Sequence, residues 1–513
     1  MSLTNRATQK KEQTQKQLNH PIPLAVAHGD GIGPEIMEQT LRVLEALNAP
    51  FTYDNIKIGK EAYLQGCKSG IPDEAWDILR ENRLLLKAPI TTPQGGGYKS
   101  LNVTLRKSLG LFANVRPCRA YTPYIKSHFP DMDLVIIREN EEDLYAGIEH
   151  QQTLEVVQCL KLITRPGCER IVRYAFEYAR AYGRKTVTCM TKDNIMKHTD
   201  GLFHQVFNEV AEEYPDINAE HYIIDIGSAI LATNPERFEV VVSPNLYGDI
   251  ISDITAQVAG SVGMGGSSNI GTSFAMFEAI HGSAPDIAGK DIANPSGLLQ
   301  AAAMLLAHTG LTKRSEMLQN ALLCTLEDGI HTADIYNESY TTKKVGTRDF
   351  AQAVIDRLGQ EPNRVKTVRL QKEAPKIQVQ INEPVREEKK LVGVDLFIDW
   401  HNDGDRNPDI IGKGLEEAAG ANWKLKMITN RGVKVYPNGL PETFCTDHWR
   451  CRFVPQQSTI AKDQEGMTSS VGTTYASVLA LMENITGENF DIIKTENLYE
   501  IGGQRAYSLG QGE

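Results

Sequence analysis

Two aspartates, Asp249 and Asp253, stand four residues apart in this 513-residue chain and are its clearest candidates for chemistry. Ile250, Ile254 and Val258 also recur every four residues, which predicts a helix that carries both carboxylates on one face. Neighbouring carboxylates repel each other unless a hard cation such as Mg²⁺ or Mn²⁺ lies between them. In a first helical turn they can instead interact with the positive end of the helix dipole. The spacing alone leaves both interpretations open.

The segments on either side of the aspartates predict a strand and glycine-rich loops. The run from Phe238 to Val242 is apolar and β-branched, which is typical of a buried strand. A loop rich in glycine and serine spans residues 263–271. The motif His281-Gly282-Ser283-Ala284-Pro285 follows it.

These motifs, in this order, resemble the metal-dependent decarboxylating dehydrogenases of 2-hydroxy acids, the isocitrate/isopropylmalate dehydrogenase family. The resemblance rests on Asn245-Leu246-Tyr247-Gly248-Asp249 with Ser252 and Asp253, and on the motif at 281–285. It covers residues 20 to 360, roughly. It implies an α/β fold with a large and a small domain and an intersubunit clasp, not a Rossmann fold.

Composition limits the class of protein. Hydrophobic residues make up 41% of the chain and charged residues 23%, as in ordinary soluble globular proteins. The net charge of −11 argues against a nucleic-acid surface. Eight scattered cysteines predict reduced thiols in a cytosol-like compartment. Residues 1–20 are mildly basic and lack the apolar centre of a secretory signal, so we expect a cytoplasmic protein, with the mitochondrial matrix as the less favoured alternative.

Five regions are expected along the chain. Residues 1–20 form a solvated tail, residues 21–111 and 260–359 the large domain, and residues 112–259 the small domain with its clasp. Residues 360–390 are polar and broken by prolines, which predicts a linker. Residues 391–513 predict a small α+β domain, an addition found in some bacterial isocitrate dehydrogenases and missing from most of the family.

The glycine loop after the first predicted strand is not a dinucleotide-binding fingerprint. Gly29, Gly31 and Gly33 follow the spacing G-x-G-x-G, not G-x-G-x-x-G. No ribose-binding acid follows in the usual place either. By the resemblance, this turn lies near the nicotinamide and does not hold a phosphate.

Three arginines, Arg106, Arg116 and Arg138, suit an acidic substrate, because a guanidinium can hold a carboxylate with two parallel hydrogen bonds. We place Arg116 and Arg138 at strand ends, where sites tend to be built. The resemblance puts all three around the substrate, together with Ser100 and Asn102.

Ser100 and Asn102 decide which substrate we expect. Isopropylmalate enzymes recognise an apolar branch with a leucine-rich segment at this place. Small hydrogen-bonding residues suit a third carboxylate, so the prediction is oxidative decarboxylation of isocitrate, a reaction of the tricarboxylic acid cycle. Homoisocitrate or 3-isopropylmalate dehydrogenase is the alternative, and a non-catalytic regulatory subunit is a distant third.

The resemblance also implies the catalytic groups. Tyr145 matches the tyrosine that protonates the enolate carbon after CO₂ has left, and Lys192 matches the catalytic lysine. Asp225 matches the third metal ligand, beside Asp249 and Asp253. In the family, the lysine and this third aspartate reach across from the other subunit, so a homodimer with shared active sites is expected. Taken alone, Tyr145 is typical of a core residue and Lys192 of a solvated one.

The cofactor site is implied by ten positions. They are Thr92, Asn194, Glu278, His281, Gly282, Ser283, Ala284, Asp286, Ile287 and Asn294.

NAD is predicted over NADP. NADP enzymes of the isocitrate group place a lysine and a tyrosine where this chain has Asp286 and Ile287, and a tyrosine and an arginine where it has Ala333 and Asn337. An aspartate can accept hydrogen bonds from the ribose hydroxyls and would repel a 2′-phosphate. At ~4 Å and an effective dielectric of ~20, each unit of like charge costs about 4 kcal/mol before screening.

Overall fold

The computed structural model describes residues 21–92, 100–370, 377–383, 385–401, 404–456 and 473–511. The predicted tail at residues 1–20 lies outside this part of the chain. Two compact units are present. One combines Met1–Ala146 with Lys161–Ile381, and the other combines Gly147–Leu160 with Asn382–Glu513.

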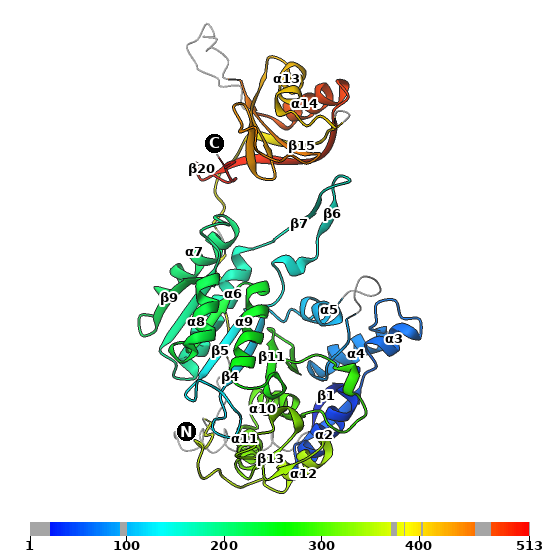
Figure 1. Ribbon diagram of the computed structural model, residues 1–513, viewed down its shortest axis with the longest axis vertical. Helices are drawn as coiled ribbons and strands as arrows, with labels where there is room; N and C mark the ends of the chain where they lie inside the picture. The colour runs from blue at the N-terminus through cyan, green and yellow to red at the C-terminus, as the bar shows by residue number, and fades with distance from the viewer. Residues whose placement is uncertain are drawn as a thin grey trace, which may run out of the picture. The chain divides into compact units, whose positions relative to one another are not determined.

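The first unit is built on one ten-stranded sheet with the order β2-β1-β3-β12-β11-β4-β5-β10-β8-β9 (Figure 1). Its strands are β1 (Ile22–Ala27), β2 (Phe51–Asn55), β3 (Leu84–Lys87), β4 (Ala113–Arg119), β5 (Asp133–Glu139), β8 (Thr186–Thr191), β9 (Asn218–Ile223), β10 (Val240–Ser243), β11 (Gly266–Ile270) and β12 (Ala275–Ala279). The outer strands pair in parallel. In the middle, β11 is antiparallel to both neighbours and β4 is antiparallel to β5.

Helices cover both faces of this sheet. They are α2 (Gly33–Ala46), α3 (Lys60–Leu64), α4 (Asp73–Asn82), α5 (Leu101–Ser108), α6 (Arg165–Ala181), α7 (Thr199–Ala211), α8 (Ile224–Thr233), α9 (Asn245–Val258), α10 (Ser296–His308), α11 (Thr312–Glu327) and α12 (Thr347–Ile355). In β1, Leu24 and Val26 enter one core cluster and Ala25 and Ala27 another. A strand buried on both faces reads as a continuous apolar run, which is why periodicity alone could not assign its faces.

The helix predicted around Asp249 and Asp253 is confirmed as α9, and the structure adds which of its faces is buried. Ile251, Thr255 and Ala256 are buried, whereas the side chain of Ile250 is 50% exposed. Both faces of α9 carry apolar residues at helical spacing, so the sequence pattern could not distinguish them.

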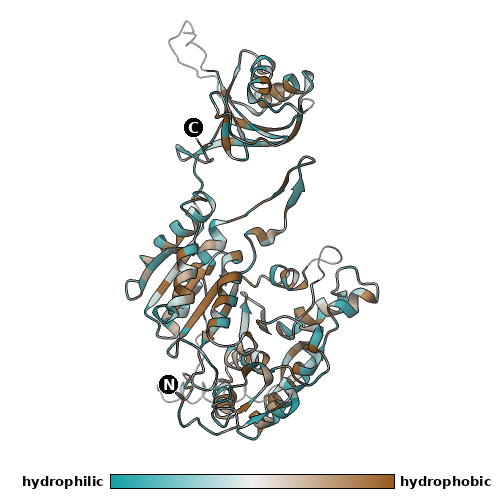
Figure 2. Ribbon diagram, in the orientation of Figure 1, coloured by the Kyte–Doolittle hydropathy of each residue, from teal (hydrophilic) through white to brown (hydrophobic). Residues whose placement is uncertain are grey.

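The second unit contains a six-stranded antiparallel sheet in the order β17-β16-β18-β15-β19-β20. Its elements are β15 (Lys389–Asp399), α13 (Pro408–Ala419), β16 (Trp423–Asn430), β17 (Val433–Tyr436), β18 (His448–Pro455), α14 (Tyr475–Gly487), β19 (Asp491–Ile501) and β20 (Gln504–Arg505). The same unit includes a hairpin formed by β6 (Glu149–Gln151) and β7 (Val157–Cys159). The sequence had not predicted β19 or β20. Figure 2 shows hydrophobic residues along the strands of both sheets.

The predicted fold class is confirmed: an α/β part with an additional small α+β domain. The division of the α/β part at residues 112 and 260 stays a prediction. All eight cysteines are free thiols, as expected. No helix among the described residues has the length and hydrophobicity that a bilayer crossing requires.

A close backbone contact between β11 and α10 leads to a prediction about stability. A Cβ atom at Gly266 would lie 2.5 Å from the amide nitrogen of Ala301 and 2.8 Å from the carbonyl oxygen of Gly297. Neither backbone atom can move away easily, so Gly266→Ala should destabilise the first unit by about 1–3 kcal/mol, as overpacking does. The measurement is the thermal unfolding midpoint.

Gly201→Ala in α7 is the matched control, because a Cβ there meets nothing within 4 Å. It should leave the midpoint unchanged or raise it slightly. An unaltered midpoint for Gly266→Ala would contradict the close packing of β11 on α10.

Candidate active site

A polar cavity of about 260 Å³ lies where β3, β5 and β12 end, beside the start of α5. It is smaller than the pockets of roughly 300–1,000 Å³ that hold drug-sized ligands, and so suits a small molecule. Ten of the predicted site residues line it. They are Ser100, Asn102, Arg106, Arg116, Arg138, Tyr145, Asp249, Glu278, His281 and Gly282.

Strand register brings two of the arginines together. β4 and β5 are antiparallel, with Asn114 directly opposite Arg138. Side chains two apart on a strand share a face, so Arg116 lies diagonally across from Arg138 on the same side of the sheet. Arg116 Nε donates to Asn114 Oδ1 at 2.7 Å, and Arg138 Nε donates to Asn245 Oδ1 at 2.9 Å. Both guanidinium planes are therefore fixed.

Arg138 is next to the last residue of β5, as predicted, but Arg116 lies in the middle of β4. The prediction that Arg116 ends a strand is wrong. The following Pro117 does not end β4, because pairing of β4 with β11 stops at Val115. On that side of the strand, a proline removes no ladder hydrogen bond.

Asp249 is the centre of the charged groups. Its Oδ1 contacts Arg138 Nη1 and lies 3.4 Å from Arg116 Nη2, while its Oδ2 accepts from the Tyr145 hydroxyl at 2.5 Å. Burial alone raises the pKa of the Asp249 carboxyl, but the charges of Arg138 and Arg116 outweigh it and lower that pKa overall. Burial raises the pKa of Tyr145, so its hydroxyl keeps its proton.

The cavity has more buried positive charge than its carboxylates neutralise. Burial and the nearby Arg116 and Arg106 lower the pKa of Arg138 to about 9. Arg138 Nη2 and Arg106 Nε are buried and have no hydrogen-bond partner among the described residues. Unpaired buried donors are costly, so these groups favour an anionic ligand.

The start of α5 adds small polar groups to the same wall. Ser100 is the N-cap residue, and its hydroxyl caps none of the described backbone amides. Asn102 Oδ1 is buried and also lacks a partner in the described part of the chain. Arg106 follows one turn later on the same helix face. The helix N-terminus, the polar side chains and the arginine together suit a carboxylate.

Sequence reasoning missed the network beneath this wall. Lys87 Nζ pairs with Glu278 Oε2 at 2.8 Å, and Arg106 Nη2 pairs with Glu278 Oε1 at 2.9 Å. Asn269 Nδ2 also donates to Glu278 Oε1, at 2.8 Å. Burial alone raises the pKa of Glu278, but the charges of Lys87 and Arg106 lower it far below its usual value. A lysine at the end of a buried strand was the only signal of this network in the sequence.

The two aspartates of α9 fit a hard divalent cation. Both are oxygen donors on one helix face, as predicted. The side chain of Asp253 is 65% exposed, and its contact with Arg116 is long, at 3.5 Å. Partial burial, followed by the nearby charge of Asp249, raises the pKa of Asp253. A cation shared by the two carboxylates would relieve that repulsion.

Lys192 and Asp225 do not line this cavity. Lys192 follows β8 directly, Asp225 is the second residue of α8, and their side chains pair at 3.1 Å. The Asp225 side chain is 67% exposed. Asn194 is exposed in the same loop as Lys192. Within the described part of one chain, these three residues are therefore separate from the arginine-lined cavity.

A second cavity, of about 470 Å³, contains part of the predicted cofactor set. His281, Gly282, Ala284, Ile287 and Asn294 line it.

Asp334, which was not predicted, also lines this second cavity. It accepts hydrogen bonds from Ser261 at 3.0 Å and from Asn294 at 3.0 Å. Burial lowers the pKa of His281, whose Nε2 is buried without a partner among the described residues.

The other predicted cofactor residues lie outside the second cavity. Asp286 is exposed in a short 3₁₀ helix, η4 (Pro285–Ile287). Thr92 Oγ1 lies 3.5 Å from the Ser100 hydroxyl, and Ser283 Oγ lies 2.8 Å from the Thr91 hydroxyl.

Known proteins resemble this chain over nearly all its length. An "isocitrate dehydrogenase (NADP)" of Rickettsia bellii is 51% identical, with 96% of this chain and 99% of the relative covered. A crystal structure of the TT0538 protein from Thermus thermophilus has a TM-score of 0.86 and 41% identity, with 96% of both chains covered. An "isocitrate dehydrogenase (NAD) catalytic subunit 5, mitochondrial" of Arabidopsis thaliana is 44% identical over 66% of this chain and 89% of its own.

Two family models match separate parts of the sequence. Residues 389–513 match the model described as "Bacterial isocitrate dehydrogenase, C-terminal domain". Residues 23–354 match the model described as "Isocitrate/isopropylmalate dehydrogenase". That match spans more than half of the chain and both cavities, and the chain belongs to the isocitrate/isopropylmalate dehydrogenase family.

Proposed function

We propose that this protein catalyses the oxidative decarboxylation of isocitrate to 2-oxoglutarate and CO₂, with reduction of NAD and dependence on Mg²⁺ or Mn²⁺. The observation that carries the proposal is the excess of buried guanidinium groups around a small cavity. Arg106, Arg116 and Arg138 all line it, and two of their nitrogens, Arg138 Nη2 and Arg106 Nε, have no hydrogen-bond partner among the described residues. The names of the relatives in Rickettsia and Arabidopsis agree on isocitrate.

Each part of the cavity has a task in this reaction. Arg116 and Arg138, fixed across β4 and β5, hold two carboxylates of the substrate in place. Ser100 and Asn102, at the start of α5, receive the third carboxylate. Among the described α5 residues that line the cavity, Asn102 and Arg106 are polar, and Val103 is the one apolar side chain that an isopropyl group could contact.

Asp249 and Asp253, with Asp225 of the partner subunit, are the residues that would hold the cation. When bound, the cation supplies Lewis-acid polarisation of the substrate oxygens, and the nicotinamide supplies the hydride acceptor. Tyr145 keeps its proton and lies beside Asp249, so it can protonate the carbon from which CO₂ has left. Lys192 of the partner subunit relays the hydroxyl proton.

A homodimer is supported by the outer surface of two neighbouring helices. α8 packs beside α9 (Figure 1), and Ile226 and Ile250 on them are 53% and 50% exposed. Exposed apolar side chains on adjacent helices fit an interface with a second copy. Such an interface would also deliver Lys192 and Asp225 to the partner's cavity. A cytoplasmic location stays a prediction.

The residues near the second cavity support NAD. Asp334 lines it, and Asp286 lies in η4 next to Ile287, so two carboxylates would disfavour a 2′-phosphate bound near them. Lys290 Nζ donates to the Asp286 carbonyl oxygen at 2.7 Å and is the cation that would oppose this effect. The names of the relatives favour NADP, because the Rickettsia protein, which matches 96% of this chain at 51% identity, is named for NADP, whereas the Arabidopsis subunit named for NAD matches 66% of it at 44% identity. The proposal for NAD therefore rests on these side chains.

The assay of substrate and cofactor tests the function. With Mg²⁺, kcat/KM for isocitrate should be higher with NAD than with NADP by at least about tenfold, equivalent to 1.4 kcal/mol. Asp286→Lys with Ile287→Tyr should shift the preference toward NADP. Equal efficiency with both cofactors would refute the NAD assignment, and faster turnover of 3-isopropylmalate or homoisocitrate would refute the substrate.

Tyr145→Phe tests the proton donor. It should slow isocitrate turnover by about 10²–10⁴-fold, the usual contribution of a general acid. Reduction of added oxalosuccinate needs no proton at that carbon, so it should be slowed much less. Tyr214→Phe is the control, since that hydroxyl bonds Glu177 away from the cavity. If Tyr145→Phe slowed both reactions equally, the tyrosine would not be the acid.

Mixed dimers test the shared site. Lys192→Ala and Asp249→Asn should each abolish turnover. After the two inactive proteins are unfolded and refolded together, half of the dimers should be mixed, each with one intact site. About one quarter of the wild-type activity should then return, if pairing is random. The absence of any recovery in a refolded mixture shown to contain mixed dimers would place both residues in one chain's site.

A further inference from the structure

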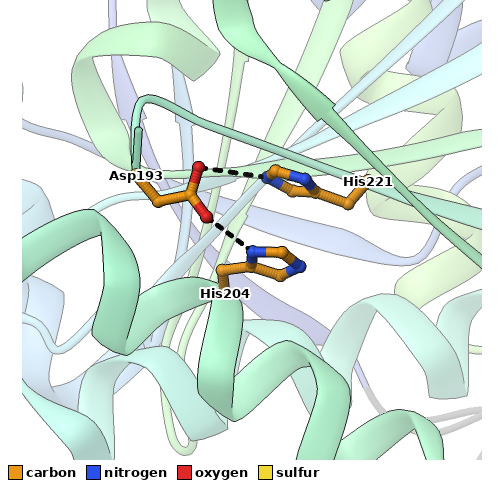
Figure 3. Close-up of side chains that lie close together, drawn as sticks. All are labelled: Asp193, His204 and His221. Atoms are coloured by element: carbon orange, nitrogen blue, oxygen red, sulfur yellow. Dashed lines mark hydrogen bonds and ion pairs between the residues drawn. The ribbon is translucent and has the colours of Figure 1, made fainter. Parts of the chain in front are cut away.

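Three side chains meet outside both cavities, on the part of the first unit formed by β8, α7 and β9 (Figure 3). Asp193 lies in the loop after β8, His204 on α7 and His221 on β9. His204 Nδ1 lies 2.7 Å from Asp193 Oδ2, and His221 Nε2 lies 3.9 Å from Asp193 Oδ1. The catalytic scheme above uses none of the three.

In this arrangement the imidazole rings of His204 and His221 both approach the carboxylate of Asp193. The two rings are stacked, with centroids 3.6 Å apart and planes inclined by 13°. Two protonated imidazoles would repel each other at that distance, so the stack requires at least one neutral ring. Burial and the neighbouring His204 lower the pKa of His221. A neutral imidazole has a lone pair that can bind a metal.

We propose that Asp193, His204 and His221 form a binding site for a divalent transition-metal ion such as Zn²⁺, separate from the carboxylates of α9. The three ligand atoms lie within 4.8 Å of one another. Zinc binds nitrogen and oxygen ligands at about 2.0–2.2 Å. Small rotations of the two imidazole rings would bring all three ligand atoms to this distance from one ion.

Accessibility and ligand type fit the same ion. The three side chains are between 19% and 25% exposed, so an ion can enter and water can complete its coordination. Each ligand comes from a different element, which fixes the three positions independently. Imidazole nitrogens favour Zn²⁺, Ni²⁺, Co²⁺ and Cu²⁺, whereas Mg²⁺ favours oxygen. The site at Asp193, His204 and His221 should therefore bind Zn²⁺ in preference to Mg²⁺, and the carboxylates of α9 should bind Mg²⁺.

Two contacts compete with the metal. The ion would replace the proton in the hydrogen bond between His204 Nδ1 and Asp193 Oδ2. The Thr191 hydroxyl lies 2.9 Å from His221 Nε2, the nitrogen that faces Asp193. A hydroxyl can rotate to give up this bond, and the ion would displace it from that nitrogen. This metal site is independent of the reaction proposed for the arginine-lined cavity.

Metal titration of the full-length protein tests the proposal. With excess Mg²⁺ present to fill the oxygen site, calorimetric titration with Zn²⁺ should show one ion bound per chain. His204→Gln and His221→Gln should each weaken this binding by at least about tenfold. Asp249→Asn and Cys159→Ser are the matched controls, and both should bind Zn²⁺ as the parent does.

A spectroscopic measurement avoids dependence on variants that fail to fold. Cu²⁺ added to the unmodified protein in excess Mg²⁺ should give an electron paramagnetic resonance signal coupled to two imidazole nitrogens. Absence of nitrogen coupling would overturn the proposal. Zinc binding that His204→Gln leaves unchanged would overturn it as well.

Discussion

The charge balance around Asp249 is the constraint on which the rest of the site depends. A buried guanidinium is tolerable only when anions and hydrogen bonds compensate it. One carboxylate, shared by Arg116 and Arg138, gives part of that compensation. Asn114, Asn245 and Ser252 accept further hydrogen bonds from the two guanidinium groups, and Asp253 lies 3.5 Å from Arg116 Nη1. Arg138 Nη2 and Arg106 Nε have no partner among the described residues, so an anionic ligand is favoured. Under the proposed function, the substrate carboxylates would complete this set of charges.

The reversal of strand direction in the middle of the sheet makes this arrangement possible. In a parallel sheet, side chains gather at the carboxyl ends of the strands. Because β4 runs against β5, Arg116 reaches the site from the middle of a strand. The backbone of β4 around Arg116 is held by hydrogen bonds to β5. A position inside a sheet is more rigid than a loop, which suits a group that must orient a carboxylate.

The sequence could predict those parts of the site that depend on local spacing. The shared face of Asp249 and Asp253 follows from helical periodicity, and Arg138 from the end of an apolar run. Arg116 was misplaced because the effect of Pro117 depends on where β11 stops pairing. Lys87 and Asn269 were missed for a related reason: each contacts Glu278 through strand order, and no local pattern in one sequence encodes that order. The buried face of α9 likewise depends on which neighbours cover it.

Under the proposed function, Lys192 and Asp225 serve the cavity of a second subunit, and the ion pair between them within one chain is compatible with that role. The Asp225 side chain is 67% exposed and that of Lys192 27% exposed, and in a single chain their charges neutralise each other. Exposed ion pairs are worth little, because water solvates both charges well. Separating the pair is then easily offset by a buried cavity that binds both groups more strongly. A fully buried pair would be costly to separate, so the exposure of the Asp225 side chain suits the proposed exchange between subunits.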